Sequence, residues 1–272
     1  MNQSVTDSVS TQGSTHSDVA GTFTGMNVLG RLLPSIVASS TPGIVSGYFI
    51  VAGSLRGNAN SAFKTSAQLT NLGGSAIAGK LVFHPAGTPT KDTDPSIAYA
   101  LTQGQTVSYD DVVQSMGTSG LGTMDLVTTS GYPADVALRI YNDEGAVNGT
   151  SGLTQEVLSP QQAHHSGTFG SLTIPANLTA FRLNVGIRTL GLPTHLTIFV
   201  LDANGNRLEP VAERNFAANT FTQDLGAAFA QQPALPPGGT IHFFVTEGSA
   251  FVYGATTDNR TNDPNLRFAS KH

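Results

Sequence analysis

The sequence predicts an all-β protein of two tandem immunoglobulin-like β-sandwich modules related by internal duplication, with jelly-roll sandwiches as the alternative. Three observations lead to this prediction. Residue patterns recur about 117 positions apart. Short apolar runs alternate with Gly, Pro, Asn and Ser, as in all-β domains. Charged residues make up only 11% of the 272 residues, which is typical of exported β-proteins.

The repeat is carried by matching blocks in the two halves of the chain. Its period exceeds the roughly 20–50 residues of solenoid repeats and therefore indicates a duplicated domain. The blocks are 62–64 with 180–182, 105–110 with 219–224, 122–127 with 239–244, and 136–143 with 252–259. Leu33-Pro34 matches Ile174-Pro175 at a wider spacing, which predicts an insertion in the first copy.

This organisation predicts the domain boundaries. The N-terminal segment is polar and lacks the basic start and apolar core of a signal peptide, so we expect a tail that is disordered in isolation and a mature exported chain. The predicted parts are a tail over 1–25, a first module over 26–158 with an insertion over 45–60, a linker over 159–167 and a second module over 168–272.

Strands are predicted where apolar residues alternate between turn residues. Leu81 and Phe83, for example, share one face of 79–84. The first-module strands are Leu29–Val37, Tyr48–Ala52, Phe63–Asn71, Gly79–His84, Ile97–Leu101, Thr106–Tyr109, Gly122–Thr128 and Asp135–Tyr141. The second-module strands are Gly170–Ile174, Phe181–Thr189, Leu196–Asp202, Val211–Phe216, Thr220–Leu225, Thr240–Glu247 and Ala250–Thr257.

A short helix is expected at the same place in each module. Val112, Val113 and Met116 fall at helical spacing, and Asp110 can cap that helix. The segment 224–231 takes this place in the second module.

Composition also excludes several functions. There is no Cys, which excludes disulfides and thiolate metal sites. The net charge is −5 and there is no basic run, so nucleic acid is not an expected partner. No run approaches the roughly 20 apolar residues of a membrane span.

Four segments resemble exported bacterial proteins of acidobacterial type, a largely uncharacterised group with tandem β-sandwich modules. They are 67–73, 79–87, 181–190 and 253–263. The resemblance implies export to an extracellular or cell-surface location and tandem β-modules. It carries over no catalytic residue.

No catalytic or cofactor-binding residue is predicted, because the chain has neither a Gly-x-Ser-x-Gly elbow nor a P-loop. His164 and His165 fall in the linker, where we expect solvated side chains. One segment resembles a calcium loop. It places Asp202, Asn204 and Asn206 at alternate positions and Glu213 at the twelfth. Arg207 stands at the sixth place, where such a loop needs Gly, and an Asn- and Gly-rich hairpin turn explains the segment fully, so the turn is favoured over calcium.

The predicted function is a non-enzymatic structural protein that self-associates into a homo-oligomer or filament by strand addition. The predicted interface is Tyr48, Phe49, Ile50 and Val51 of the insertion, or else the tail; the competing interpretation is that this apolar stretch packs on its own module. Adhesion or binding of a glycan, with stacking by Tyr132 and Tyr141, is the alternative function. A hydrolase with a scattered site ranks third.

Overall fold

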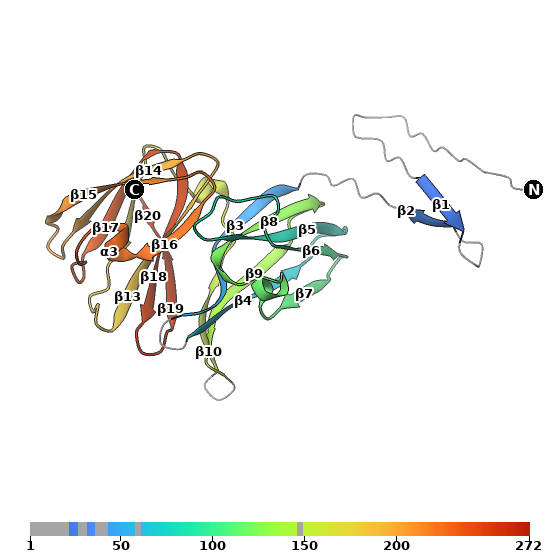
Figure 1. The fold of residues 1–272 in the computed structure, drawn as a ribbon, viewed down its shortest axis with the longest axis horizontal. Helices are drawn as coiled ribbons and strands as arrows, with labels where there is room; N and C mark the ends of the chain where they lie inside the picture. The colour runs from blue at the N-terminus through green and yellow to red at the C-terminus, as the bar shows by residue number, and fades with distance from the viewer. Residues whose placement is uncertain (1–21, 27–31, 36–42, 58–60, 146–148) are drawn as a thin grey trace, which may run out of the picture. The chain divides into compact units, whose positions relative to one another are not determined.

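In the computed structural model the chain forms two units, 1–42 and 43–272. The structure describes residues 22–26, 32–35, 43–57, 61–145 and 149–272 (Figure 1). In the first unit β1 (Thr22–Met26) and β2 (Leu32–Ser35) pair as an antiparallel two-stranded sheet. The strand predicted over 29–37 therefore overlaps β2, and the remainder of the predicted tail lies outside the described residues.

The first half of the second unit contains two antiparallel sheets. One has the order β3-β8-β5-β6 and the other β7-β4-β9-β10, and a short β3–β4 pairing joins them at a corner. The strands are β3 (Ile44–Arg56), β4 (Ala62–Thr70), β5 (Ile77–Pro85), β6 (Ser96–Leu101), β7 (Thr106–Tyr109), β8 (Gly120–Ser130), β9 (Asp135–Asp143) and β10 (Thr150–Gln155).

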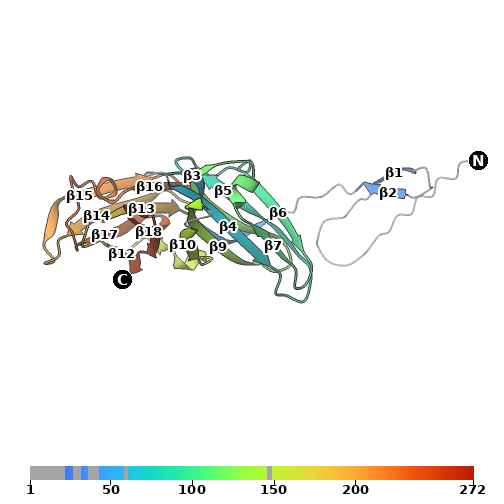
Figure 2. The same cartoon turned by 90° about the horizontal axis from the view of Figure 1, so that it is seen from below.

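The second half repeats this arrangement beside the first (Figure 1 and Figure 2). Its sheets have the orders β12-β17-β14-β15, with β20 beyond β12, and β16-β13-β18, with β19 and β11 both pairing β18. The strands are β11 (His164–His165), β12 (Phe169–Thr173), β13 (Phe181–Thr189), β14 (Thr194–Leu201), β15 (Arg207–Phe216), β16 (Phe221–Leu225), β17 (Thr240–Glu247), β18 (Ser249–Asp258), β19 (Pro264–Phe268) and β20 (Ser270–Lys271).

The two halves have the same order of paired strands. Strands β3 to β10 correspond one by one to β12 to β19, and the short helices α1 (Val112–Ser115) and α3 (Gly226–Phe229) occupy equivalent places. The predicted all-β sandwich class is confirmed. Immunoglobulin-like topology and descent by duplication stay predictions that this strand order supports.

The predicted insertion over 45–60 is wrong. Strand β3 pairs with β8 and corresponds to β12, and Phe49 and Ile50 are fully buried, so this segment belongs to the sandwich itself. The insertion was inferred from the match between Leu33-Pro34 and Ile174-Pro175. Leu33-Pro34 lies in β2 of the other unit, so it is not part of the sandwich that β3 begins.

Each half has its own apolar core, built by strand alternation. Leu81 and Phe83 point inward together, as predicted, and both are fully buried. The helix α1 begins after Asp111, whose side chain accepts a hydrogen bond from the Gln114 N–H, so Asp111 and not Asp110 is the cap. No helix among the described residues is long and apolar enough to cross a membrane.

One sheet of the second half is covered on both faces. Val185 and Ile187 of β13 point into the second core, whereas Phe221, Phe251 and Tyr253 on the opposite face pack within the core cluster of the first half. The shared sheet β16-β13-β18 therefore belongs to two cores, which makes 43–272 one compact unit.

The predicted linker takes part in this packing. It forms a 3-10 turn, η1 (Pro160–Gln162), followed by β11, which pairs with β18. His164 is buried at 3% exposure, so the prediction of a solvated pair was wrong for His164, while His165 is exposed. The difference follows from geometry, because successive side chains of a strand point to opposite faces.

Candidate functional site

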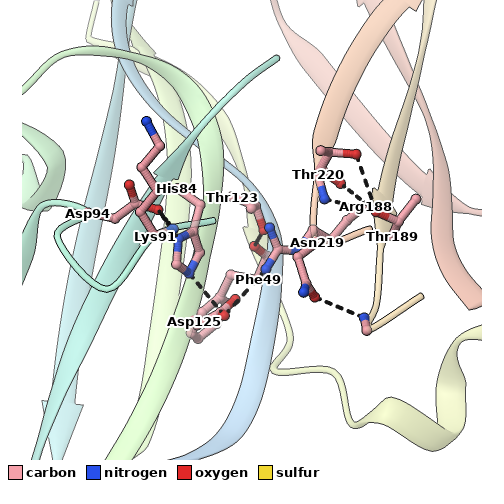
Figure 3. A network of polar contacts seen from close by, with 11 residues as sticks. Phe49, His84, Lys91, Asp94, Thr123, Asp125, Arg188, Thr189, Asn219 and Thr220 are labelled. Atoms are coloured by element: carbon pink, nitrogen blue, oxygen red, sulfur yellow. Dashed lines mark hydrogen bonds and ion pairs between the residues drawn. The ribbon is translucent and has the colours of Figure 1, made fainter. Parts of the chain in front are cut away.

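A chain of buried charged groups lies where the two halves meet (Figure 3). His84 of β5 stands between two carboxylates: its Nδ1 is 2.6 Å from Asp94 Oδ2, and its Nε2 is 3.0 Å from Asp125 Oδ2. Arg188 of β13 reaches the same oxygen of Asp125 at 3.4 Å. The side chains of all four residues are no more than 9% exposed.

Local strand geometry places these groups. His84 alternates with the buried Phe83 and so points out of the first core, toward the second half. Arg188 leaves the shared sheet on the face that also carries Gly186. Asp94 comes from the β5–β6 loop, which the second half holds through backbone bonds to Phe221 O (2.8 Å) and Asn219 O (2.9 Å).

Each titratable member of this network has a partner. Each ring nitrogen of His84 faces a carboxylate oxygen, and the Arg188 guanidinium lies beside Asp125. Pairing is the condition under which buried charges are tolerated. Burial lowers the pKa of the Arg188 guanidinium, and Asp125 opposes that change.

This network is built to hold the halves together. The hydroxyl of the neighbouring Thr123 donates to the Phe49 carbonyl at 2.6 Å. Within the described ranges no three His, Asp or Glu side chains are grouped to hold a metal ion. We therefore assign the four charged residues a structural role at the seam, the surface where the two halves meet.

The predicted interface residues do not offer a free strand edge. Tyr48 exchanges two backbone hydrogen bonds of 2.9 Å with Leu158, and the Gln155 side-chain amide binds both backbone groups of Val51. The Thr65 hydroxyl likewise bonds the N–H and C=O of Gly53 at 2.8 Å. The prediction that Tyr48, Phe49, Ile50 and Val51 bind a neighbour is therefore corrected: the chain itself closes this edge.

A different strand, β6, presents an open edge. Among the described strands it pairs only with β5, and the bond from Phe83 N–H to Pro95 O (2.8 Å) fixes which residues face that partner. Because bonding alternates along antiparallel strands, the backbone groups of Ser96, Ala98 and Ala100 point away from β5. All three residues are exposed, and β6 has no charged residue.

The edge strand β15 makes a useful comparison. It carries Arg207, Glu209, Pro210 and Glu213 at exposed positions. Charges and proline are the usual means by which an edge strand is kept from pairing with another chain. Strand β6 lacks them, and sequence reasoning missed it because an edge is defined only by the pairing of the whole sheet.

The predicted calcium ligands do not converge. Asp202 Oδ1 accepts the Asn204 and Asn206 N–H groups at 2.8 Å, and the bonds to Asn206 lower the Asp202 pKa. Glu213 lies in β15 opposite Thr197, where it accepts the Thr197 hydroxyl at 3.0 Å. The segment is a hairpin turn, so the calcium interpretation was wrong for these residues.

The aromatic residues predicted to stack on a glycan are also separate. Tyr132 precedes β9 and is 72% exposed, whereas Tyr141 lies near the far end of β9. The Tyr141 hydroxyl donates to the Asp110 carbonyl at 3.0 Å, and the Arg139 guanidinium lies 5.1 Å from its ring centre.

A cleft of about 670 Å³ opens in the second half between the end of β12 and β19. Phe181 lines it with 37% of its surface exposed, together with Asp263, Asn265 and Arg267. Asp258 also lines the cleft, but its carboxylate caps the following turn through the Arg260 and Thr261 N–H groups at 2.8 Å.

The sequence matches no protein-family model and no curated protein. The fold defines the class, an all-β protein of paired sandwiches, and its resemblance to acidobacterial-type exported proteins remains a prediction.

Proposed function

We propose that this chain is a non-enzymatic structural protein of the cell surface or extracellular space that self-associates by strand addition. In this proposal the β1–β2 segment of one copy pairs with the β6 edge of another. The observation that carries it is the open, uncharged edge of β6.

The edge of β6 can accept an added strand because its outward-facing backbone groups are free to form hydrogen bonds among the described residues. An edge strand exposes a row of backbone donors and acceptors, and an added strand satisfies them without particular side chains. Ser96, Ala98 and Ala100 are small, so a second backbone can approach closely. No charged residue of β6 must be desolvated.

The donor side follows from the first unit. Strands β1 and β2 form a sheet of only two strands, and an isolated pair of strands is at best marginally stable in water. The stretch from Val19 to Gly30 contains no charged residue. Joining a larger sheet would stabilise it.

The proposal is tested by light scattering coupled to gel filtration over a range of protein concentrations. The wild type should exceed the monomer mass increasingly with concentration. The double variant Ala98→Lys, Ala100→Lys and a chain lacking 1–42 should both be monomers, because a charged edge or a missing donor prevents pairing.

The matched control is Thr150→Lys, Thr154→Lys, which adds the same charge at exposed positions of another edge strand, β10. This control should associate like the wild type. A wild type that stays monomeric throughout, or a β6 variant that associates as the wild type does, would show that the proposal is wrong.

Glycan binding is the second candidate, and the cleft beside β19 favours it. Sugar sites combine an aromatic face with a few polar groups, and Phe181 with Asp263, Asn265 and Arg267 supplies both. A glycan array should then give hits that Phe181→Ala removes. An array without hits would eliminate this candidate.

A further inference from the structure

A second cavity, of about 260 Å³, lies at the seam between the two halves. Its two walls differ in chemistry. The first half contributes an apolar wall: Val51, Leu55, Phe63, Leu121, Ile140 and Leu153. The second half contributes a wall with four polar residues: Arg182, Asn184, Gln223 and Thr257. The cavity is smaller than a typical drug-sized site of roughly 300–1,000 Å³, which sets the size of what it can hold.

The polar wall is built by register on the shared sheet. Arg182 lies opposite Thr257, and Asn184 lies opposite both Leu225 and Ala255. Alternation along β13 and β18 turns these residues to the same side, away from the second core. Leu225, which also lines the cavity, is 60% exposed.

Several polar groups on this wall have no partner among the described residues. Thr257 is 4% exposed and Asn184 is half-buried, and neither the Thr257 hydroxyl nor the Asn184 amide is among the fully buried unpartnered atoms, so both groups are accessible from the cavity. Gln223 Oε1 accepts the Tyr253 hydroxyl at 2.6 Å, which leaves the Gln223 NH₂ group as a donor. Polar groups that face a cavity in this way are available to hydrogen-bond a ligand that enters it.

The charge of the polar wall indicates which kind of ligand the cavity can bind. Arg182 is the one charged residue among those that line the cavity within the described ranges. Its guanidinium donates to uncharged side-chain oxygens, Asn259 Oδ1 at 3.2 Å and Asn262 Oδ1 at 2.9 Å. Burial lowers the Arg182 pKa and the nearby Asp258 carboxylate opposes that change, but among the described residues no carboxylate is hydrogen-bonded to the guanidinium.

We propose that the seam cavity binds a small monocarboxylate with an apolar body. The carboxylate lies against Arg182, Asn184 and Thr257, because ionised oxygens accept charge-assisted hydrogen bonds from such donors. The apolar body lies against the wall formed by the first half. This inference is independent of strand addition, since β6 contributes nothing to the cavity.

Calorimetric titration with octanoate tests the proposal, with octan-1-ol as the uncharged probe of equal length. Wild-type protein should bind one octanoate per chain, and octanol at least tenfold more weakly. Thr257→Val, which keeps the side-chain shape, and Asn184→Leu should each weaken octanoate binding about tenfold. Ala255→Phe, which fills the cavity, should abolish binding of both probes.

Two controls make the result decisive. Leu192→Ala changes an exposed apolar residue that does not line the cavity and should bind octanoate normally. The β6 variant Ala98→Lys, Ala100→Lys should also bind normally, which separates this proposal from the assembly proposal. Thermal melting confirms that each variant is folded. Absence of saturable octanoate binding to the wild type, or full binding by folded Ala255→Phe, would overturn the inference.

Discussion

Arg188 Nη2 lies 3.4 Å from Asp125 Oδ2, and this contact joins a buried cation of the second half to a buried anion of the first. The arginine is 2% exposed and the aspartate 6%. Two further arginine nitrogens, Nε and Nη1, have no hydrogen-bond partner in the part of the chain that the structure describes. The seam thus depends on a charge pair whose members are costly to bury singly.

Arg188→Met should destabilise the protein by about 3–5 kcal/mol, because it removes the guanidinium beside the buried Asp125 carboxylate, which then keeps only His84 as a partner. Urea unfolding at neutral pH measures the loss. The double variant Arg188→Met, Asp125→Asn should be less destabilised than the sum of the single changes, since it removes both charges together. A single variant as stable as the wild type would contradict the role given to this pair.

His164 should make stability depend on pH. Burial lowers its pKa from 6.5 to about 4, with a smaller opposing effect of the Ala269 backbone. Between pH 4 and pH 6.5, His164 is protonated in the unfolded chain but stays neutral in the folded chain. Stability is therefore complete above pH 6.5 and falls toward pH 4, by roughly 3 kcal/mol.

His164→Phe removes this dependence, and its ring can keep the edge-on contact with Phe243, whose centre is 4.9 Å away. The unfolding free energy at pH 7 and pH 4.5 measures the effect. The exposed neighbour supplies the control, because His165→Phe should retain the wild-type pH dependence. Equal slopes for wild type and His164→Phe would refute the prediction.

Gly186→Ala should weaken the seam. A Cβ at this position would lie 2.2 Å from the Tyr253 ring, so the ring or the strand must move. Overpacking of this kind costs about 1–3 kcal/mol. Thermal unfolding measures the loss, and adding Tyr253→Leu should restore part of it. Failure of the smaller side chain to relieve the loss would place the strain elsewhere.

Calcium should have no effect on the Asp202 turn. The Asp202 carboxylate already accepts the Asn204 and Asn206 amides, which organise the hairpin without a metal. The melting temperature should be the same in EDTA and in millimolar calcium. Asp202→Ala should lower it equally in both, whereas a rise with calcium that this variant abolishes would restore the metal interpretation.

The sequence predicted most strands because alternation is a local signal. Leu81 and Phe83 show it, and they point inward as expected. Strand β10 was missed because Leu153 is its single large apolar residue. Strand β3 was found but misread as an insertion, since its role depends on pairing with β8 far along the chain.

The charged contacts across the seam could not be predicted from the sequence, for a different reason. His84 shares β5 with Lys80, and Arg188 shares β13 with Arg182, so the strand sequences do not show which of these residues is buried. Nothing in the sequence pairs them with Asp125 or Asp94, because the partners are brought together by the packing of one half on the other. The open edge of β6 is likewise a property of the whole sheet.

Because one sheet is shared between two cores, the second half cannot be separated from the first without exposing apolar side chains. A fragment spanning only 168–272 would expose Phe221, Phe251 and Tyr253 to water. Such an exposed apolar surface promotes aggregation. Neither half is therefore expected to be an independently folding domain. The two halves depend on each other for burial of this sheet, so neither should fold when expressed without the other.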